Sequence, residues 1–124
     1  GALLTYPKMP TAMKAWSKYG EHAKTRGEDR YIGRKLFSIF SQAGLRAINV
    51  VPIPQVVTGE DPNLLSMFAA VPTQIILAEK DALVSKGYIN EEEFETGMEE
   101  VQQFTKAPGA FAMAMSFLAT GTVP

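Results

Sequence analysis

Apolar residues spaced three or four positions apart predict a helix over about residues 12–26. Thr11 is a favourable N-cap for this helix, and Gly27 follows it at the place where a left-handed residue commonly ends a helix. The six residues that open the chain are mostly apolar and predict the end of a strand or an extended lead-in. The apolar side of the helix consists of Met13, Trp16, Tyr19, Gly20 and Ala23.

A second helical stripe and a strand come next. Asp29 is suited to cap a helix over about residues 30–43, which a glycine then ends. The β-branched run at 45–51 predicts a strand. Pro52 and Pro54 cannot donate to a sheet ladder, so we expect this end of the strand to lie at a sheet edge or to leave the sheet.

A long helical stretch is predicted after Asp61, an N-cap residue that is followed by a proline at the first helical position. Apolar residues continue at helical spacing as far as Gly87. Pro72 lies inside this stretch. Because proline removes a backbone donor and clashes with the preceding turn, we expect a kink or a break near residue 71.

The last two elements complete the predicted fold. Asn90 and Glu93 have the spacing of a capping box and predict a helix over about residues 91–105. Residues 110–119 are apolar on both alternating faces, which favours an inner strand or one covered on both sides. The pattern therefore predicts an α+β fold, with residues 1–124 in one domain. It has about five helical segments and two main strands in the order β-α-α-β-α-α-α-β.

Composition narrows the kinds of site that the chain can carry. The 124 residues contain no cysteine and one histidine, His22, which excludes disulfide scaffolds, iron–sulfur clusters and histidine-cluster metal sites within one chain. No apolar run is long enough to span a bilayer and no secretory signal pattern opens the sequence, so we expect a cytoplasmic protein. The first residue is Gly1, which indicates either a removed tag or a piece of a longer protein.

Charge is distributed unevenly along the chain. Residues 1–46 hold nine Lys and Arg against three acidic residues, whereas residues 47–124 hold ten acidic residues against three Lys. A basic half can indicate a nucleic-acid surface. Because the net charge is −1 and no nucleic-acid-binding motif is present, we favour solvated helix faces instead. The two halves can also attract each other, within one chain or between two.

Motifs of catalysis are absent from the sequence. The ten glycines form neither a G-x-G-x-x-G nor a Walker loop, and there is no G-x-S-x-G elbow. His22 lies near the edge of the apolar side of its helix, where surface or partly buried packing is favoured over a role as a general base. Three adjacent carboxylates, Glu91 to Glu93, point in different directions and match the helix dipole, which is favoured over a metal site.

The aromatic residues leave two interpretations open. They can line an apolar ligand pocket, or they can be ordinary core. The six methionines likewise suit an adaptable pocket, an interface or gap-filling in a core. The aromatic residues in question are Tyr6, Trp16, Tyr19, Tyr31, Phe68 and Phe94.

The segment Tyr31-Ile-Gly33-Arg34-Lys-Leu36 is followed by Ala43-Gly44-Leu45 and a β-branched strand. This segment resembles the G-R-x-L helix that leads through A-G-F or A-G-L into the sixth strand of class I S-adenosylmethionine-dependent methyltransferases of the ubiquinone and menaquinone biosynthesis type. Three further stretches are similar to the C-terminal half of those proteins: the stretch after strand five, the helical insertion and the last strand. They are residues 1–7, 83–94 and 108–124.

The resemblance implies a remnant of an α/β methyltransferase fold in which the final strand is antiparallel and lies between strands five and six. The family's cofactor-binding glycine loop lies outside these residues. The resemblance therefore implies S-adenosylmethionine binding only if the missing half is supplied. It implies a substrate wall formed by Tyr6, Trp16, Tyr31 and Arg34, and no catalytic residue. For Arg34, a structural role in bonding carboxylates or helix carbonyls is an equal alternative.

An open strand edge follows from this resemblance. With strand five nearly absent, one edge of the last strand would be unpaired, and an exposed apolar edge favours aggregation unless it is covered. We therefore expect a homodimer formed through that edge. Two functions remain open. One is a methyltransferase-like module, inactive alone, that contributes an apolar substrate pocket. The other is a free-standing, non-catalytic protein that binds a small ligand or a partner.

Overall fold

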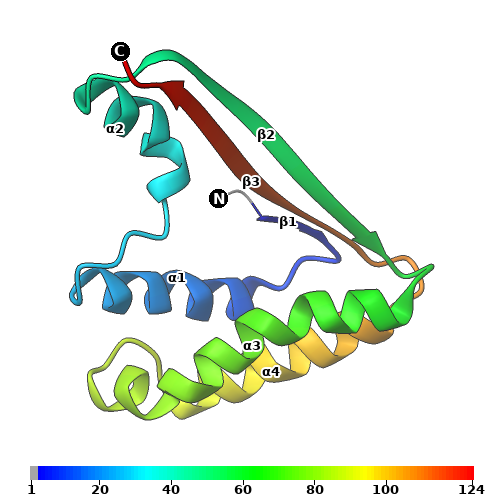
Figure 1. Cartoon of the computed structure of the whole chain (residues 1–124). Coiled ribbons are helices and arrows are strands. Elements are labelled where there is room, and N and C mark those ends of the chain that lie inside the picture. Colours follow the sequence, from blue (N-terminus) through cyan, green and yellow to red (C-terminus); the bar gives the residue numbers. More distant parts are fainter. Residues whose placement is uncertain (1–2) are drawn as a thin grey trace.

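Residues 3–124 are described by a computed structural model with an α+β architecture (Figure 1). The strands are β1 (Leu3–Tyr6), β2 (Arg46–Thr58) and β3 (Phe111–Thr122). The helices are α1 (Pro10–Lys24), the 3₁₀ helix η1 (Ile32–Lys35), α2 (Leu36–Gln42), α3 (Pro62–Ser85) and α4 (Glu91–Lys106). The expected fold class is confirmed. The order of elements fits the expected one, with the short opening strand present as β1. The helix count differs, because the expected pair of helices after β2 is the single helix α3.

The sheet is antiparallel throughout, with the order β1-β3-β2. The last strand is therefore central, as its apolar residues on both faces predicted, and antiparallel, as the resemblance implied. β2 and β3 form a long ribbon from Thr58↔Phe111 to Arg46↔Thr122, with an irregularity between Arg46 and Asn49. The short strand β1 covers only the start of the other edge of β3, from Phe111 to Ala114.

The helices α1, α3 and α4 pack together at the end of the ribbon where β2 passes into α3 and α4 returns into β3 (Figure 1). Two buried clusters form the core. The first joins the sheet to the helices through Met9, Val57, Leu65, Phe104, Ala110 and Ala112. The second lies among the helices, farther from the sheet, and contains Ala15, Ile76, Leu83, Ile89 and Phe94.

The start of α1 corrects the predicted N-cap. The helix begins at Pro10 and its N-cap is Met9, which has no capping side chain. A distant carboxylate replaces the local cap: Glu100 on α4 accepts hydrogen bonds from the backbone N–H groups of Thr11 (3.1 Å) and Ala12 (2.9 Å). Because this carboxylate satisfies free donors at the positive end of the helix dipole, the helix starts two residues earlier than the sequence pattern predicts.

The second predicted helix, over about 30–43, begins later than expected. Asp29 accepts a hydrogen bond from the backbone N–H of Tyr31 (2.8 Å) and pairs with Lys35 (2.6 Å). These bonds form a turn instead of a helix cap. The chain then passes through η1 into the seven-residue helix α2. The pKa of Asp29 is lowered by the hydrogen bond from Lys35 and by that from the Tyr31 backbone.

α3 continues unbroken through Pro72, so of the expected kink or break near residue 71 the break does not occur. Proline removes one backbone donor from the helix interior, but packing can keep a helix intact. Leu65 and Ala69 are buried before Pro72, and Ile76 and Leu83 are buried after it. The two halves of α3 are therefore held by the same core.

The ends of α3 and α4 match their sequence signals. Asp61 accepts from the backbone N–H of Leu64 (3.0 Å), and Asn90 and Glu93 form the predicted capping box. After α3, Gly87 has a φ of +76°, its N–H donates to Val84, and the N–H of Tyr88 donates to Leu83. This pair of bonds is a Schellman motif, which ends the helix and turns the chain toward α4.

Candidate functional site

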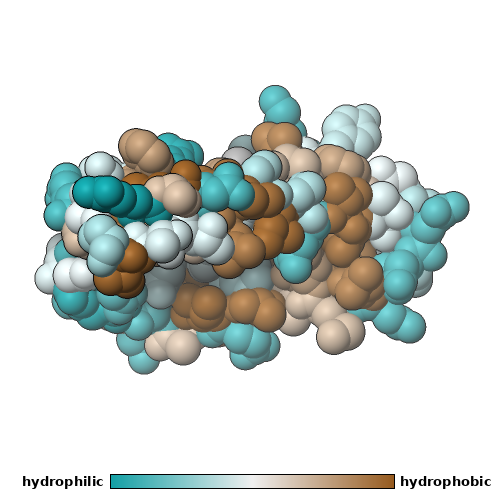
Figure 2. Space-filling view, turned by 45° about the horizontal axis from the view of Figure 1, so that its top comes forward, coloured by the Kyte–Doolittle hydropathy of each residue, from teal (hydrophilic) through white to brown (hydrophobic). Residues whose placement is uncertain are grey.

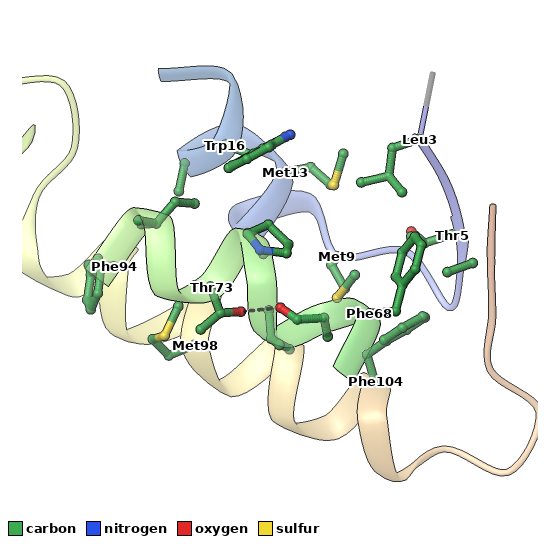
Figure 3. A pocket seen from close by; sticks show the side chains of 18 residues that line it. Leu3, Thr5, Met9, Met13, Trp16, Phe68, Thr73, Phe94, Met98 and Phe104 are labelled. Carbon is green, nitrogen blue, oxygen red and sulfur yellow. Dashed lines mark hydrogen bonds between the residues drawn. The ribbon is translucent and has the colours of Figure 1, made fainter. Parts of the chain in front are cut away.

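A small apolar cavity lies where α1, α3 and α4 meet the sheet (Figure 3). Its volume is about 70 Å³. All three helices and the strands β1 and β3 contribute to the wall. The lining consists of Leu3, Thr5, Met9, Ala12, Met13, Ala15, Trp16, Phe68, Ala69, Pro72, Thr73, Ile76, Phe94, Gly97, Met98, Val101, Phe104 and Ala112.

The wall of the cavity offers almost no polar group. Thr73 carries one of its two hydroxyls, and its Oγ1 donates to the backbone oxygen of Ala69 within the same helix (2.8 Å; Figure 3). An apolar cavity of this kind excludes water, which needs two or more polar partners. The lining therefore favours an uncharged, apolar occupant and supplies no general acid, general base or nucleophile.

Three methionines give the cavity its capacity to adapt. Met9 precedes α1, Met13 lies on α1 and Met98 lies on α4, and all three line the wall. Methionine has three rotatable side-chain bonds and a polarisable sulfur, so it fills irregular spaces and can change rotamer to admit a ligand. The cavity is smaller than the 300–1,000 Å³ or so of typical ligand pockets, so a bound ring would require such movement.

The ring of Trp16 contacts two side chains that do not line the cavity, Tyr19 and Arg30. This ring stacks on Tyr19 with 5.3 Å between centroids, and the Arg30 guanidinium lies 3.8 Å from the Trp16 centroid. Arg30 Nη1 also donates to the Trp16 backbone oxygen (2.8 Å). Burial lowers the pKa of Arg30. Arg30 was not predicted as a site residue, because Trp16 is fourteen positions away in sequence and no local motif marks the contact.

Of the four substrate-wall residues that the resemblance implied, one lines the cavity. This residue is Trp16. Tyr6 is 69% exposed at the end of β1, and strand alternation places it on the sheet face opposite to Thr5, which lines the cavity. Tyr31 is exposed and lies against Arg34, with 4.8 Å between guanidinium and ring centroid. The structure thus pairs Tyr31 with Arg34 but brings neither into the lining.

The remaining sequence candidates have packing roles. Phe68 and Phe94 line the cavity as core aromatics. His22 is more deeply buried than expected, at 3% exposure. Glu93 belongs to the capping box and pairs with Lys14 of α1, and the hydrogen bond from Lys14 lowers the pKa of its carboxyl. Within residues 3–124, no group of three His, Cys, Asp or Glu side chains could hold a metal ion.

The basic and acidic parts of the sequence meet inside the chain. Lys14 on α1 pairs with Glu93 on α4, and Arg26, just after α1, pairs with Glu79 on α3 (2.6 Å). The pKa of Glu79 is lowered chiefly by the hydrogen bond from Arg26. These pairs join the basic part of the sequence to the acidic part within one chain, between α1 with the turn that follows it and the helices α3 and α4.

Comparisons with known proteins give no family for this chain: no protein-family model matches it, and a search of curated proteins finds no significant match. Over the part of the chain that the structure describes, the helices are too short or too polar to cross a membrane.

Proposed function

We propose that this chain is the substrate-side, C-terminal portion of a methyltransferase-like protein. In this proposal it is inactive alone and contributes an apolar substrate pocket. The observation that carries the proposal is the place of β3, the last strand, which is antiparallel and lies between β1 and β2. The resemblance in the sequence gives the final strand of class I methyltransferases this same place. The apolar cavity beside β1 supports the pocket part of the proposal.

The residues present do not fit a complete S-adenosylmethionine site. Dinucleotide-like and nucleoside cofactors are held by a glycine-rich turn between a strand and a helix N-terminus. The sheet described here is antiparallel, and the three glycines with positive φ, Gly27, Gly44 and Gly87, all follow helices. We therefore derive no methyl-transfer step from this chain and assign the cofactor to a separate part or partner.

The two long edges of the ribbon differ in their ability to accept another strand. Among the described residues 3–124, the stretch of β3 from Met115 to Thr122 has no strand partner on the side of β1, and it contains no proline. On the opposite edge of the sheet, β2 carries Pro52 and Pro54, two residues apart and thus facing the same way. Proline cannot donate, so this outer edge is protected against pairing. The open edge of β3 is the one suited to a further strand.

Exposed apolar residues on one face of the β2–β3 ribbon also support contact with another part or partner. Val51, Ile53 and Leu118 lie beyond the helices on the face that includes buried Val57, and they are 41%, 44% and 52% exposed. Figure 2 shows apolar side chains gathered over the middle of one side of the molecule. Contiguous exposed apolar surface marks a contact with another part or partner. In this proposal the contact is with the cofactor-binding part.

A second candidate function uses the same open edge. The chain can be a free-standing, non-catalytic protein that binds a small apolar ligand in the cavity and forms a homodimer by pairing β3 with a second copy. The unpaired length of β3 supports this candidate equally, because an isologous antiparallel contact would cover it. A cytoplasmic location belongs to both candidates.

Two measurements separate the candidates. Calorimetric titration of the chain with S-adenosylmethionine should give no binding heat, whereas a protein extended in frame by the sequence encoded upstream should bind it. Micromolar binding to the isolated chain would contradict the proposed division of the site. Sedimentation of the isolated chain tests the second candidate. A dimer that Leu118→Lys, an exposed position on the unpaired stretch of β3, converts to monomer would favour the free-standing protein, with Gln55→Lys on β2 as control.

A further inference from the structure

His22 is a buried imidazole with an incomplete set of partners. In the part of the chain that the structure describes, His22 is the one polar residue that is buried, with 3% of its surface exposed. Its Nδ1 is buried and has no hydrogen-bond partner. Buried polar atoms are nearly always paired, so an unpaired ring nitrogen in the core calls for a physical explanation.

Charged groups reach the ring from two directions. From the end of α3, Lys86 places its Nζ 3.2 Å from Nε2 of His22. From about two turns earlier on α3, Glu79 places its Oε2 3.7 Å from Nδ1 of His22. The turn after α3 adds Tyr88, whose ring centroid is 5.3 Å from that of His22. Arg26, which follows α1, is bonded to the other oxygen of Glu79.

The chemistry of these groups determines the proton on the ring. An ammonium group has three donors and no acceptor, so Lys86 can bond Nε2 only if that nitrogen accepts. The hydrogen of the neutral ring then lies on Nδ1, which faces the Glu79 carboxylate. A neutral His22 thus lies between a cation and an anion and links the end of α1 to both.

We propose that His22 is a pH-responsive contact, which holds Lys86 while the ring is neutral and releases it when Nε2 takes up a proton from solvent. The imidazolium has no acceptor nitrogen, so the Lys86 bond is lost and two cations face each other. The protonated ring instead gains attraction to Glu79, where it competes with Arg26. Histidine is suited to this role because its charge ordinarily changes between about pH 5 and 8.

The released segment is the turn between α3 and α4. Lys86 caps the end of α3, and the Schellman bonds of Gly87 and Tyr88 follow directly. Ile89, which comes next, is 3% exposed in the second core cluster. Because the core still holds Ile89, proton uptake loosens the turn and leaves α4 in place. Protonation of His22 is therefore expected to change the order of the turn between α3 and α4 and not the packing of the core.

The single histidine makes the test direct, because one ring resonance in the intact chain belongs to His22. Nuclear magnetic resonance titration of its C2 proton gives the midpoint of protonation. Lys86→Gln should raise this midpoint and Glu79→Gln should lower it, each by roughly one pH unit or more, as expected for charges at this range. Lys24→Gln, on the last turn of α1, is the matched control and should leave the midpoint unchanged.

Hydrogen exchange tests the release itself. In the unsubstituted chain, the protection factors of the Gly87 and Tyr88 amides should fall several-fold below the midpoint, whereas those in the middle of α4 should not. Lys86→Gln should abolish this pH dependence. The proposal is wrong if Lys86→Gln leaves or lowers the midpoint, or if protection in the turn is the same on both sides of it. Because Lys86 is exposed, this variant tests the proposal even if Glu79→Gln does not fold.

Discussion

The guanidinium of Arg30 lies over the ring of Trp16, a residue of the cavity wall, with its Cζ 3.8 Å from the ring centroid. Its Nη1 bonds the backbone oxygen of the same residue. Gly20 leaves room for this position, since a Cβ there would lie 2.9 Å from Nη1. One arginine thus fixes both the aromatic wall and the loop that leads from α1 to η1.

Replacing Arg30 by lysine should separate the contribution of its positive charge from that of its planar guanidinium group. Arg30→Lys keeps the cation but loses the planar stack and the directed bond to the carbonyl. We expect the free energy of unfolding to fall by about 1–2 kcal/mol. Urea titration followed by the fluorescence of Trp16, the single tryptophan, measures this change. Arg34→Lys, at an exposed pair with Tyr31, should cost less than about 0.5 kcal/mol, and an equal loss in both variants would contradict the assignment.

Local signals predicted those parts of the fold that depend on neighbouring residues. Asp61 and the Asn90–Glu93 capping box each bond a donor three positions away, and both helices begin where the sequence indicates. The start of α1 could not be predicted in this way. Its cap is Glu100, eighty-nine positions from Thr11, and no local pattern carries that contact.

For the candidate site too, the sequence predicted what depends on spacing within one helix and missed what depends on packing between elements. Helical spacing predicted the apolar side on which Trp16 lies, and the resemblance alone placed it on a substrate wall. For the aromatic residues and the methionines, the sequence left both a pocket and an ordinary core open. The meeting of Met9, Met13 and Met98 depends on the packing of α1 against α4, which sequence spacing does not give. Tyr6 was placed on the wall by the resemblance alone, which does not say to which face of β1 its side chain belongs. Its alternation with Thr5 gives the opposite face.

The distant cap should contribute measurably to stability. Glu100→Ala removes the acceptor for two backbone donors at the start of α1, and we expect a loss of about 1 kcal/mol, as for other N-cap removals. The midpoint of urea unfolding reports the change. Glu99→Ala, at an exposed neighbouring position on α4, is the control and should change stability by less than half as much. Similar midpoints for the two variants would show that the cap contributes little.

A close approach of two backbones makes Gly59 irreplaceable. A Cβ at this position would lie 2.2 Å from the carbonyl oxygen of Pro108, and the contact joins the turn after β2 to the one before β3. Backbone atoms cannot move aside as a side chain can, so Gly59→Ala should cost about 2 kcal/mol or more. Gly109→Ala, with no atom within 4 Å of its added Cβ, is the matched control in thermal unfolding. Equal melting temperatures would contradict this prediction.

Acid should weaken the start of α4. The pKa of Glu93 is lowered from 4.5, first by the hydrogen bond from Lys14 and then by that from the Asn90 backbone. A carboxyl with a lowered folded-state pKa contributes stability that is present above its unfolded value and is lost as pH falls through the folded one. Glu93→Gln should therefore lower the melting temperature at pH 7, and the difference from the unsubstituted chain should shrink as the pH falls below 4.5. Glu92→Gln, in the same helical turn, should show no such convergence.

The cavity should admit small apolar molecules, and more readily once a methionine is shortened. At about 70 Å³ it is roughly half the size of an apolar cavity of about 150 Å³ that holds benzene or xenon. We expect xenon to shift the ¹³C-methyl signals of Met9, Met13 and Met98 in the unsubstituted chain, while exposed Met67 stays unchanged. Met98→Ala should cost about 2 kcal/mol or more and allow benzene to bind, because truncation leaves an unfilled space. Met67→Ala should do neither. If benzene moves neither the Met9 nor the Met13 signal in Met98→Ala, the space is closed by repacking of the core and cannot serve as a ligand pocket.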